Sequence, residues 1–469
     1  MAAFFANNSC NPFTSPSDRC VVDAYVRYAV NATSAEHYKL ALGFVRQHNI
    51  RLVIRNTGHD YLGRSTGPGS LAIWTHHIND IKVLDYKSSY YQGKAVKLGA
   101  GVMALDAQKV AHSRGLVIVT GDSSSVGVAG GYTQGGGHGP LASTFGLAAD
   151  QVVEWDVVTS RGERLIASPN TNSDLYWALC GGGGGTYGIV LSMTVKAYAD
   201  TAITSANLTF SSDGVSNEVF YDAVETFLTS VPAIGDLGAT SIWLLTKGVF
   251  TVAPVTAPGV APAQLLPFLQ PTLDLLKQRN MSFSYTIQEF PSFLQGYHAL
   301  NADPKITEYN LAGRLMPRNL LTDAKSRSTL MDVIRSIVDY GAVLSGTSFN
   351  VTGKAAFHNS VNPVWRTSVF NALVATPYNH THFEENIVGQ QLIRGTLLPM
   401  LEALTPGGGA YMNEADFKQP DYEQVFYGNS YDRLLSVKRR YDPDGRLYGV
   451  TTVGSEAWQA DPNGRLCRA

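Results

Sequence analysis

The sequence predicts an α+β protein with two domains of different texture. Its 469 residues are enough for two domains, or three, each with its own core. Up to about residue 201, strands, helices and glycine clusters follow one another as in α/β proteins. From about residue 202 the glycine clusters disappear, and strand-like runs alternate with helical ones, which is typical of an antiparallel sheet covered by helices.

The first elements predict an α/β beginning. Residues 34–49, SAEHYKLALGFVRQHN, have the spacing of an amphipathic helix with Ser34 as its cap. RLVIRNTGH then predicts a strand that runs into a turn with His59 at its tip, and residues 70–85 predict a second strand with an irregular exit. Residues 95–114 predict a strand, a glycine turn and a helix from about Met103 to Arg114.

Two glycine clusters follow, VGVAGGYTQGGGHG at 126–139 and CGGGGGTYG at 180–188, with a predicted strand between them. A flexible linker is one interpretation of such runs, but little Ser or Pro accompanies them and patterned elements flank them. Glycine in this setting indicates either backbone that approaches a ligand closely or turns with positive φ. Neither a P-loop nor a strand–GxGxxG–helix motif is present. The turns at 57–63, 127–139 and 181–188 could still donate backbone N–H groups to one extended anionic cofactor.

The chain divides into three predicted segments. Residues 1–201 form the first domain, and residues 202–404 form the second, with the antiparallel sheet. TPGGG at 405–409 is the expected return hinge. The tail, 405–469 with this hinge, is too short for a domain and is expected to rejoin the first one.

Charge and hydropathy exclude several partners. The formal net charge of -2 gives no reason to expect nucleic acid or an anionic membrane. The most apolar region, 242–269, is broken by Lys247, prolines and glycines, so we expect no membrane span there. No GxSxG motif with triad partners supports a hydrolase. His76, His77, His380 and His382 lack a carboxylate or cysteine at ligand spacing, so no metal site is predicted.

The compartment is predicted indirectly. MAAFFANNSC is too short for the apolar region of a signal peptide. Six acceptor triplets for N-glycosylation occur, at Asn7, Asn31, Asn207, Asn280, Asn350 and Asn379. Four cysteines allow three pairings, and a Cys10–Cys20 bridge would fit an oxidising compartment. We therefore expect a secreted glycoprotein.

Four stretches carry a family resemblance that spans nearly the whole chain. They are RNTGHDYLGRS, SVGVAGGYTQGGGHG with FGLAADQV, NSDLYWALCGGGGGTYGIV, and the tail from AYMNEADF to GVTTVGSE. They resemble the p-cresol methylhydroxylase/vanillyl-alcohol oxidase superfamily, within it the berberine-bridge-enzyme-like oxidases, and most of all the secreted fungal isoamyl alcohol oxidase-like branch. The resemblance implies a two-domain flavoprotein whose FAD domain has two α/β subdomains and includes the tail, with a substrate domain between.

The resemblance also assigns roles to residues. His59 matches the histidine that bonds covalently to the 8α methyl of the isoalloxazine, in a turn that holds the diphosphate. Relatives carry a second tether, a cysteine, where this chain has Ser123 or Ser124, so a single covalent link is expected. Val126 falls where a small residue accompanies oxidases. The cofactor-binding residues implied are Arg55, Asn56, Thr57, Gly58, His59, Asp60, Tyr61, Ser65, Ser123, Ser124, Val126, Gly127, Gly130, Gly131, Gly135, Gly136, Gly137, His138, Gly139, Gly185, Gly188, Ile189 and Asn413.

The resemblance implies a catalytic group of three residues. Tyr411 of the YMN motif matches the base, Asn413 lies near it, and Tyr132 replaces the histidine that supports the flavin's pyrimidine edge. The resulting expectation is a monomeric FAD oxidase that takes an alcohol, a carbohydrate or a secondary metabolite, with O2 reduced to H2O2. Two alternatives stay open: an isomerase or cyclase on the same flavin fold, and a binding protein that has lost its chemistry.

Overall fold

A three-stranded parallel sheet opens the chain. The computed structural model describes residues 4–22, 24–300, 308–461 and 464–469. The first sheet has the order β1 (Tyr28–Asn31), β3 (Leu71–Trp74), β2 (Leu52–Arg55). Helix α1 (Ala35–Gln47) begins where Ser34 accepts a hydrogen bond from the His37 N–H, and it buries Tyr38, Leu42 and Val45. The predicted helix and its cap are confirmed.

A five-stranded antiparallel sheet forms the second layer of this half. Its order is β4 (Ile81–Lys87), β5 (Gln92–Gly99), β9 (Ile189–Lys196), β7 (Val152–Val158), β8 (Arg164–Ala167). The single strand predicted at 70–85 is wrong: β3 and β4 lie in different sheets, because the chain turns at 75–80. Strand β7 is buried on both faces, unlike an alternating surface strand.

Short elements complete this half. They are α2 (Ala104–His112), β6 (Leu116–Val117), the π-helical turn η2 (Val128–Tyr132), α3 (Ala142–Phe145), η3 (Ala148–Gln151), α4 (Ser173–Leu179) and β10 (Tyr198–Ala199), which pairs with β6. The helix predicted at about 103–114 is therefore confirmed as α2, two residues shorter at its end.

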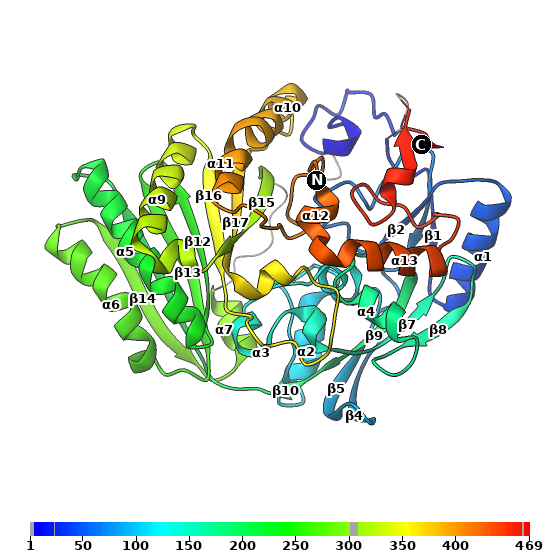
Figure 1. Ribbon diagram of the computed structural model, residues 1–469, viewed down its shortest axis with the longest axis horizontal. Coiled ribbons are helices and arrows are strands. Elements are labelled where there is room, and N and C mark those ends of the chain that lie inside the picture. Colours follow the sequence, from blue (N-terminus) through cyan, green and yellow to red (C-terminus); the bar gives the residue numbers. More distant parts are fainter. Residues whose placement is uncertain (1–3, 23, 301–307, 462–463) are drawn as a thin grey trace.

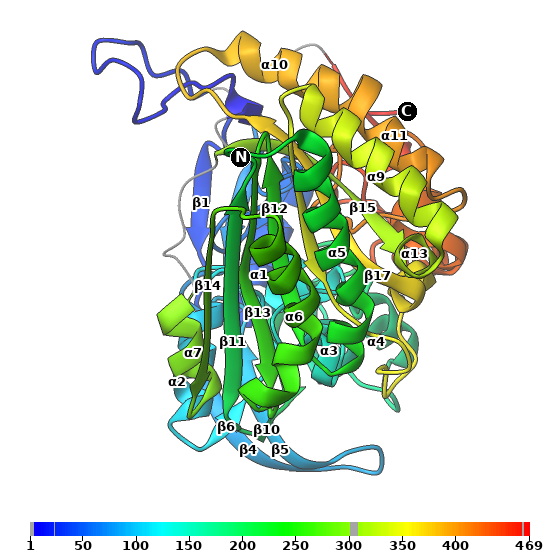
Figure 2. The same ribbon diagram turned by 90° about the vertical axis from the view of Figure 1, so that its left-hand side faces the viewer.

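A seven-stranded antiparallel sheet builds the other half. Its order is β14 (Phe283–Phe290), β11 (Ile203–Ser211), β13 (Val249–Pro258), β12 (Thr240–Thr246), β16 (Val343–Ser348), β17 (Ser368–Pro377), β15 (Tyr309–Pro317). Figures 1 and 2 show α5 (Asn217–Asp236), α6 (Pro262–Gln278) and α9 (Ala324–Asp339) along the outer face of this sheet, and Figure 1 shows the rest of the molecule on the inner side. This arrangement confirms the α+β fold class with a helix-covered antiparallel sheet.

The remaining helices border these layers. They are α7 (Phe293–Leu300), α8 (Asn319–Thr322), η4 (Pro363–Thr367), α10 (Phe383–Leu392), the π-helical turn η5 (Ile393–Leu397) and α11 (Leu398–Ala403). One core lies between the seven-stranded sheet and its outer helices, and it contains Phe210, Phe227, Trp243 and Phe250. A second core joins the first half to Phe349 and Trp365, so apolar packing runs continuously from one half into the other.

The tail consists of α12 (Tyr422–Tyr427), η6 (Gly428–Ser430), α13 (Tyr431–Tyr441), η7 (Ser455–Ala457) and the hairpin β18 (Trp458–Ala460)–β19 (Leu466–Arg468). Helix α13 packs against α4, as Figure 1 shows near the centre of the molecule. The buried Lys438 ammonium of α13 donates to the carbonyl of Thr186, at the end of the second glycine cluster. The domain boundaries themselves, at 201/202 and 404/405, stay a prediction.

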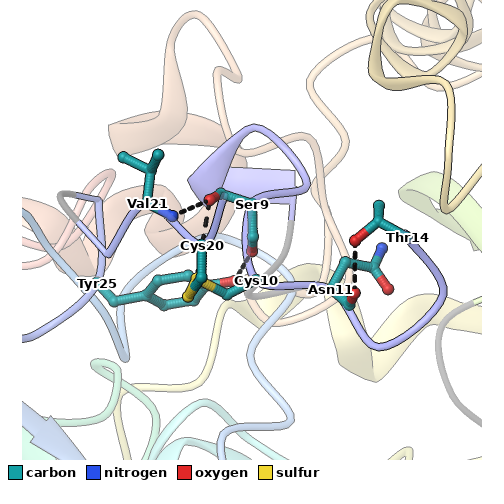
Figure 3. The surroundings of a disulfide bond; sticks show 7 residues. All are labelled: Ser9, Cys10, Asn11, Thr14, Cys20, Val21 and Tyr25. Atoms are coloured by element: carbon teal, nitrogen blue, oxygen red, sulfur yellow. Dashed lines mark hydrogen bonds between the residues drawn. A yellow bond between two sulfur atoms is a disulfide. The ribbon is translucent and has the colours of Figure 1, made fainter. Parts of the chain in front are cut away.

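The N-terminal segment contains a disulfide between Cys10 and Cys20 (Figure 3). In Figure 3 the Ser9 hydroxyl accepts a hydrogen bond from the Val21 N–H at 2.8 Å, which holds the two ends of the disulfide loop together. The short helix η1 (Phe4–Ala6) precedes it. The predicted Cys10–Cys20 bridge is therefore present, whereas Cys180 is buried and Cys467 exposed as free thiols, so the four cysteines do not form two bridges.

Candidate functional site

A cavity of about 470 Å³ opens between the first half of the chain and the tail. Most of the predicted site residues line it: Arg55, Asn56, Thr57, Gly58, His59, Asp60, Tyr61, Ser65, Ser123, Val126, Gly127, Gly130, Gly131, Tyr132, His138, Gly185, Gly188, Tyr411 and Asn413. The predicted residues outside its lining are Ser124, Gly135, Gly136, Gly137, Gly139 and Ile189. No described residue from 202 to 404 lines the cavity, so the second half supplies only residues that contact the lining side chains.

The turn after β2 presents His59 to the cavity. Its shape is set by Asp60, whose carboxylate accepts hydrogen bonds from the backbone N–H groups of Leu62 at 2.9 Å and Ser65 at 3.0 Å, and also from that of Arg64. The His59 ring contacts the Ser125 hydroxyl, with Nε2 and Oγ 2.7 Å apart. Partial burial lowers the pKa of His59, which favours the neutral imidazole near pH 7.

The first glycine cluster serves two purposes. At Gly127 an added Cβ would lie 2.2 Å from the Asn56 amide nitrogen, so glycine permits the wall to approach the His59 turn closely. At Gly139 a Cβ would lie 2.0 Å from the Thr120 carbonyl oxygen, although this residue does not line the cavity. Gly139 therefore packs against the backbone of Thr120 and not against the cavity.

The three predicted catalytic residues lie together. The Asn413 amide nitrogen donates to the Tyr411 hydroxyl at 2.8 Å and to the Gly131 carbonyl at 2.7 Å. The Tyr411 hydroxyl in turn lies 3.4 Å from the Tyr132 carbonyl oxygen. Burial, and then the charge of Glu414, raise the pKa of Tyr411, so its phenol stays protonated at neutral pH. Burial also raises the pKa of Tyr132, whose hydroxyl has no hydrogen-bond partner among the described residues.

Sequence reasoning missed two carboxylates that line the cavity, Asp122 and Glu414. Glu414 accepts hydrogen bonds from His138 Nε2 at 3.0 Å and from the Asn371 amide at 2.7 Å. Enclosure by the protein raises the pKa of Asp122 to about 6. Glu414 directly follows the YMN motif, and Asp122 directly precedes the serines 123–125, so their position beside recognised motifs was the available signal.

The tail supplies a further part of the wall through Leu447, Tyr448 and Gly449, which sequence reasoning also missed. The Lys438 ammonium holds this part in place, because it donates to the Leu447 carbonyl and to the Asp442 carboxylate, each at 2.6 Å. Burial lowers the pKa of Lys438, although Asp442 opposes the shift. The buried Lys438–Asp442 ion pair thus lies within the tail and holds its wall segment, while the bond from Lys438 to the Thr186 carbonyl connects the tail to the first half.

The histidines considered as ligands have other neighbours. His76 and His77 contact the side-chain oxygens of Asn56 and Asn31, at 3.0 and 2.7 Å. Within the described ranges, no group of three or more His, Cys, Asp or Glu side chains could hold a metal ion. In the same part of the chain, no helix is both long enough and apolar enough to span a membrane.

Comparison with known protein families gives two matches. Residues 26–168 match the FAD binding domain family, and residues 410–447 match the family described as berberine and berberine-like. These two ranges contain every residue that lines the cavity outside 184–190 and 448–449.

Individual proteins are similar over the whole chain. The FAD-linked oxidoreductase sor8 of Hypocrea jecorina is 44% identical over 470 residues, which cover 100% of this chain and 81% of that protein. The bifunctional decalin synthase calF of Penicillium decumbens is 40% identical, over 98% of this chain and 82% of its own. The crystal structure of the VAO-type flavoprotein MtVAO615 from Myceliophthora thermophila C1 has a TM-score of 0.93 at 40% identity, and covers 99% of this chain and 86% of that one.

Proposed function

Because this chain belongs to the FAD-linked oxidoreductases of the vanillyl-alcohol oxidase and berberine-bridge type, we propose that it is an oxidase with covalently bound FAD. Its substrate is an alcohol, a carbohydrate or a secondary metabolite, and O2 is reduced to H2O2. One observation carries the proposal: a neutral histidine, His59, faces a glycine-walled cavity that also holds acid–base side chains.

The residues of the cavity fit FAD. The buried side-chain oxygens of Ser123, Tyr132 and Gln134, all in the lining, have no hydrogen-bond partner among the described residues. A ligand with many polar edges, such as the isoalloxazine and ribityl chain, would satisfy them. At Gly130 an added Cβ would meet no atom within 4 Å, so the wall leaves space there for a ligand.

A single covalent link to His59 fits the local chemistry. When the Nε2–H group donates to the Ser125 hydroxyl, the other ring nitrogen keeps its lone pair, which makes it the nucleophile. A second link through cysteine is not expected, because no described cysteine lines the cavity. Cys180 is buried, with the Trp155 indole N–H 3.2 Å from its sulfur.

When bound, FAD supplies the hydride acceptor and the site that reacts with O2. The chain's own residues bind and orient the substrate. The Tyr411 phenol, which stays protonated, can donate a hydrogen bond to it, and Asn413 fixes that hydroxyl. Val126 is a short side chain in the wall, which leaves room for O2 to approach.

Two measurements test the proposal. Mass spectrometry of the denatured, proteolysed protein should find FAD on the peptide with His59, and H59A should release its flavin on denaturation. H77A is the matched control, because His77 lies outside the cavity and should not affect the link. A peroxide-coupled screen over alcohols, sugars and phenolics should identify a substrate that reduces the flavin under anaerobic conditions. A yellow protein with an unmodified His59 peptide would contradict the covalent link. A flavin that no compound reduces would contradict the oxidase activity.

An isomerase or cyclase is the second candidate, because calF, a bifunctional decalin synthase, is 40% identical. In that case the substrate is converted without net oxidation. The two functions differ in stoichiometry: the oxidase releases one H2O2 for each substrate consumed, whereas the cyclase converts substrate with no peroxide.

Secretion as a glycoprotein is also proposed. The Cys10–Cys20 disulfide is the form that an oxidising compartment favours. Asn7, Asn31 and Asn280 are exposed, whereas Asn207 lies inside β11 with a buried side-chain oxygen. Enzymatic deglycosylation of the protein secreted by a fungal host should reduce its mass, and peptide mapping should find Asn207 unmodified. Glycan on Asn207 would contradict this interpretation.

A further inference from the structure

A pair of ionisable side chains, Glu414 and His138, lies in the wall beside Tyr411. The His138 Nε2–H donates to Glu414 Oε2 at 3.0 Å, and the Asn371 amide of β17 donates to the same oxygen at 2.7 Å. Both residues line the cavity. Among the described residues no donor is placed on Oε1, the second oxygen of the carboxylate. The carboxylate is thus held from behind by two donors and has one oxygen left for a ligand.

The surroundings of His138 favour its protonated form. Its ring lies among the aromatic rings of Phe349, Trp365 and Tyr411, with ring centroids 6.4, 6.0 and 5.3 Å away. Burial lowers the pKa of His138. The Glu414 carboxylate at Nε2 and the nearby Asp122 together raise it by more than burial lowers it, so the pKa of His138 lies above its ordinary value. Aromatic faces also attract a cation. The surroundings of His138 therefore strengthen the hydrogen bond from its Nε2–H to the Glu414 carboxylate.

Tyr411 differs from Glu414 as a proton acceptor. A tyrosine can accept a proton only after losing its own, and both burial and the charge of Glu414 oppose that loss by raising its pKa. Of the described residues, only Asn413 donates a side-chain hydrogen bond to its hydroxyl, and this amide is uncharged. The Tyr411 phenol is consequently suited to donate a hydrogen bond. The Glu414 carboxylate, whose Oε1 has no donor among the described residues, is suited to accept a proton.

We propose that Glu414 is the group that accepts the substrate's proton, and that His138 and Asn371 position its carboxylate. The inference rests on the proposed oxidase function and names a residue for it. In the oxidation of an alcohol, the hydroxyl proton passes to Glu414, and the electron pair of the O–H bond completes the C=O bond. The hydrogen on carbon leaves with its two electrons to FAD, so atoms and charge balance. A neutral amine reacts likewise, with its N–H proton.

The titratable groups around Glu414 come from several elements. Asp122 precedes the serines 123–125, Tyr132 ends η2, and Tyr61 follows the His59 turn; His138 and Tyr411 complete the set. The charge of Glu414 raises the pKa of Tyr61, Asp122, Tyr132 and Tyr411. His138 is the one basic side chain in this set. Because the pKa of Asp122 is raised to about 6, Asp122 also titrates within the tested range, and the variants of Glu414 and His138 are needed to separate its contribution.

The test compares E414Q, E414D, Y411F and H138Q in the FAD-loaded protein. E163Q is the control, because Glu163 is exposed and does not line the cavity. Anaerobic flavin reduction is followed in a stopped-flow instrument from about pH 3.5, below the ordinary glutamate pKa of about 4.3, to about pH 9, with the substrate found by the peroxide screen. E414Q should lose about 10²–10⁴ in the reduction rate, as expected for a missing general base. E414D should recover part of it, and Y411F should lose far less than E414Q.

The pH profile separates a positioning role from a structural one. In H138Q the carboxylate loses its cationic partner, so the acid limb of the reduction rate should move to higher pH, and in E414Q this limb should disappear. An E414Q rate within tenfold of the native one with an unchanged acid limb would overturn the proposal. So would a limb that disappears in Y411F and persists in E414Q, which would make Tyr411 the base.

A readout without substrate keeps this inference separate from the oxidase function. NMR of histidines labelled at carbon ε1, with H138Q for assignment, follows the titration of His138 in the native protein and in E414Q. The midpoint should fall in E414Q and stay unchanged in E163Q, and an unchanged midpoint in E414Q would refute the ion pair. If no compound reduces the native flavin, the oxidase proposal fails, and the titration still decides whether the pair exists.

Discussion

A buried ion pair between the two halves of the molecule gives a quantitative prediction. Asp150, in η3 of the first half, is fully buried, and its carboxylate accepts four hydrogen bonds. Two come from the Arg366 guanidinium of η4, at 2.8 and 2.7 Å, one from the Asn359 amide at 2.7 Å and one from the Leu147 N–H at 2.9 Å. Arg366 also provides the only positive charge among these donors.

The R366M variant should lose about 3–5 kcal/mol in the free energy of unfolding, because it leaves a buried carboxylate without a cation. Two hydrogen bonds to a charged group, at about 1.5–3 kcal/mol each, give about 3–6 kcal/mol, which overlaps this range. The exposed pair Arg318–Asp236 has the same two-bond geometry, at 2.8 and 2.6 Å, with the side chains 39% and 49% exposed. R318M should therefore lose less than about 1 kcal/mol.

Urea denaturation followed by tryptophan fluorescence measures both losses in the same protein. The double variant D150N/R366M removes the charge together with its partner, so it should recover at least about 2 kcal/mol relative to R366M. Equal losses in R366M and R318M would show that burial does not set the cost of breaking the pair. A double variant no more stable than R366M would show that packing, and not the unpaired charge, causes the loss.

Three further substitutions test other parts of the fold. K438M should lower the free energy of unfolding, measured in urea, by about 3–5 kcal/mol, because it leaves the buried Asp442 carboxylate without a cation. Limited proteolysis should then cleave the tail, and a tail that resists cleavage would contradict this account. W243A should cost about 3–5 kcal/mol, seen as a lower Tm, because Trp243 is fully buried in the sheet core; a loss under 1 kcal/mol would argue against this packing. Because the pKa of Asp122 is raised to about 6 in the folded protein, its protonated carboxyl contributes to the free energy of unfolding below about pH 4, and this contribution is lost as the pH rises through 6. D122N should therefore stabilise the protein at pH 8 by about 3 kcal/mol relative to its effect at pH 4. Urea midpoints that keep the same difference from pH 4 to 8 would refute the Asp122 shift.

The parts of the site that consecutive residues form could be predicted from the sequence. The turn that carries His59 is shaped by Asp60 and the three residues that donate to it, all within five positions, so the local pattern contained the relevant contacts. The family motifs identified the wall at 126–132 in the same way. The fold class could also be predicted, because the period of the apolar residues distinguishes strands from helices in long, regular segments.

Contacts between distant positions could not be predicted. Glu414 and His138 are 276 positions apart, and Asp150 and Arg366 are 216 apart, so a single sequence gives no sign that either pair meets. Glycine composition was also ambiguous: Gly130 lines the cavity and Gly139 packs against Thr120, yet both occur in the same run. The prediction of one strand at 70–85 was wrong because apolar residues on both sides of a turn have the same pattern as one continuous strand.

The composition of the cavity wall has a consequence for biosynthesis. His59 leaves the ribosome several hundred residues before Tyr411 and the segment 447–449. At the usual rates of synthesis, the interval between them is on the order of tens of seconds. Until it ends, the histidine faces a half-built wall that lacks Tyr448 and the Lys438 anchor. The cavity that faces His59 is therefore complete only after residue 449 has been synthesised and Lys438 has bound the Leu447 carbonyl.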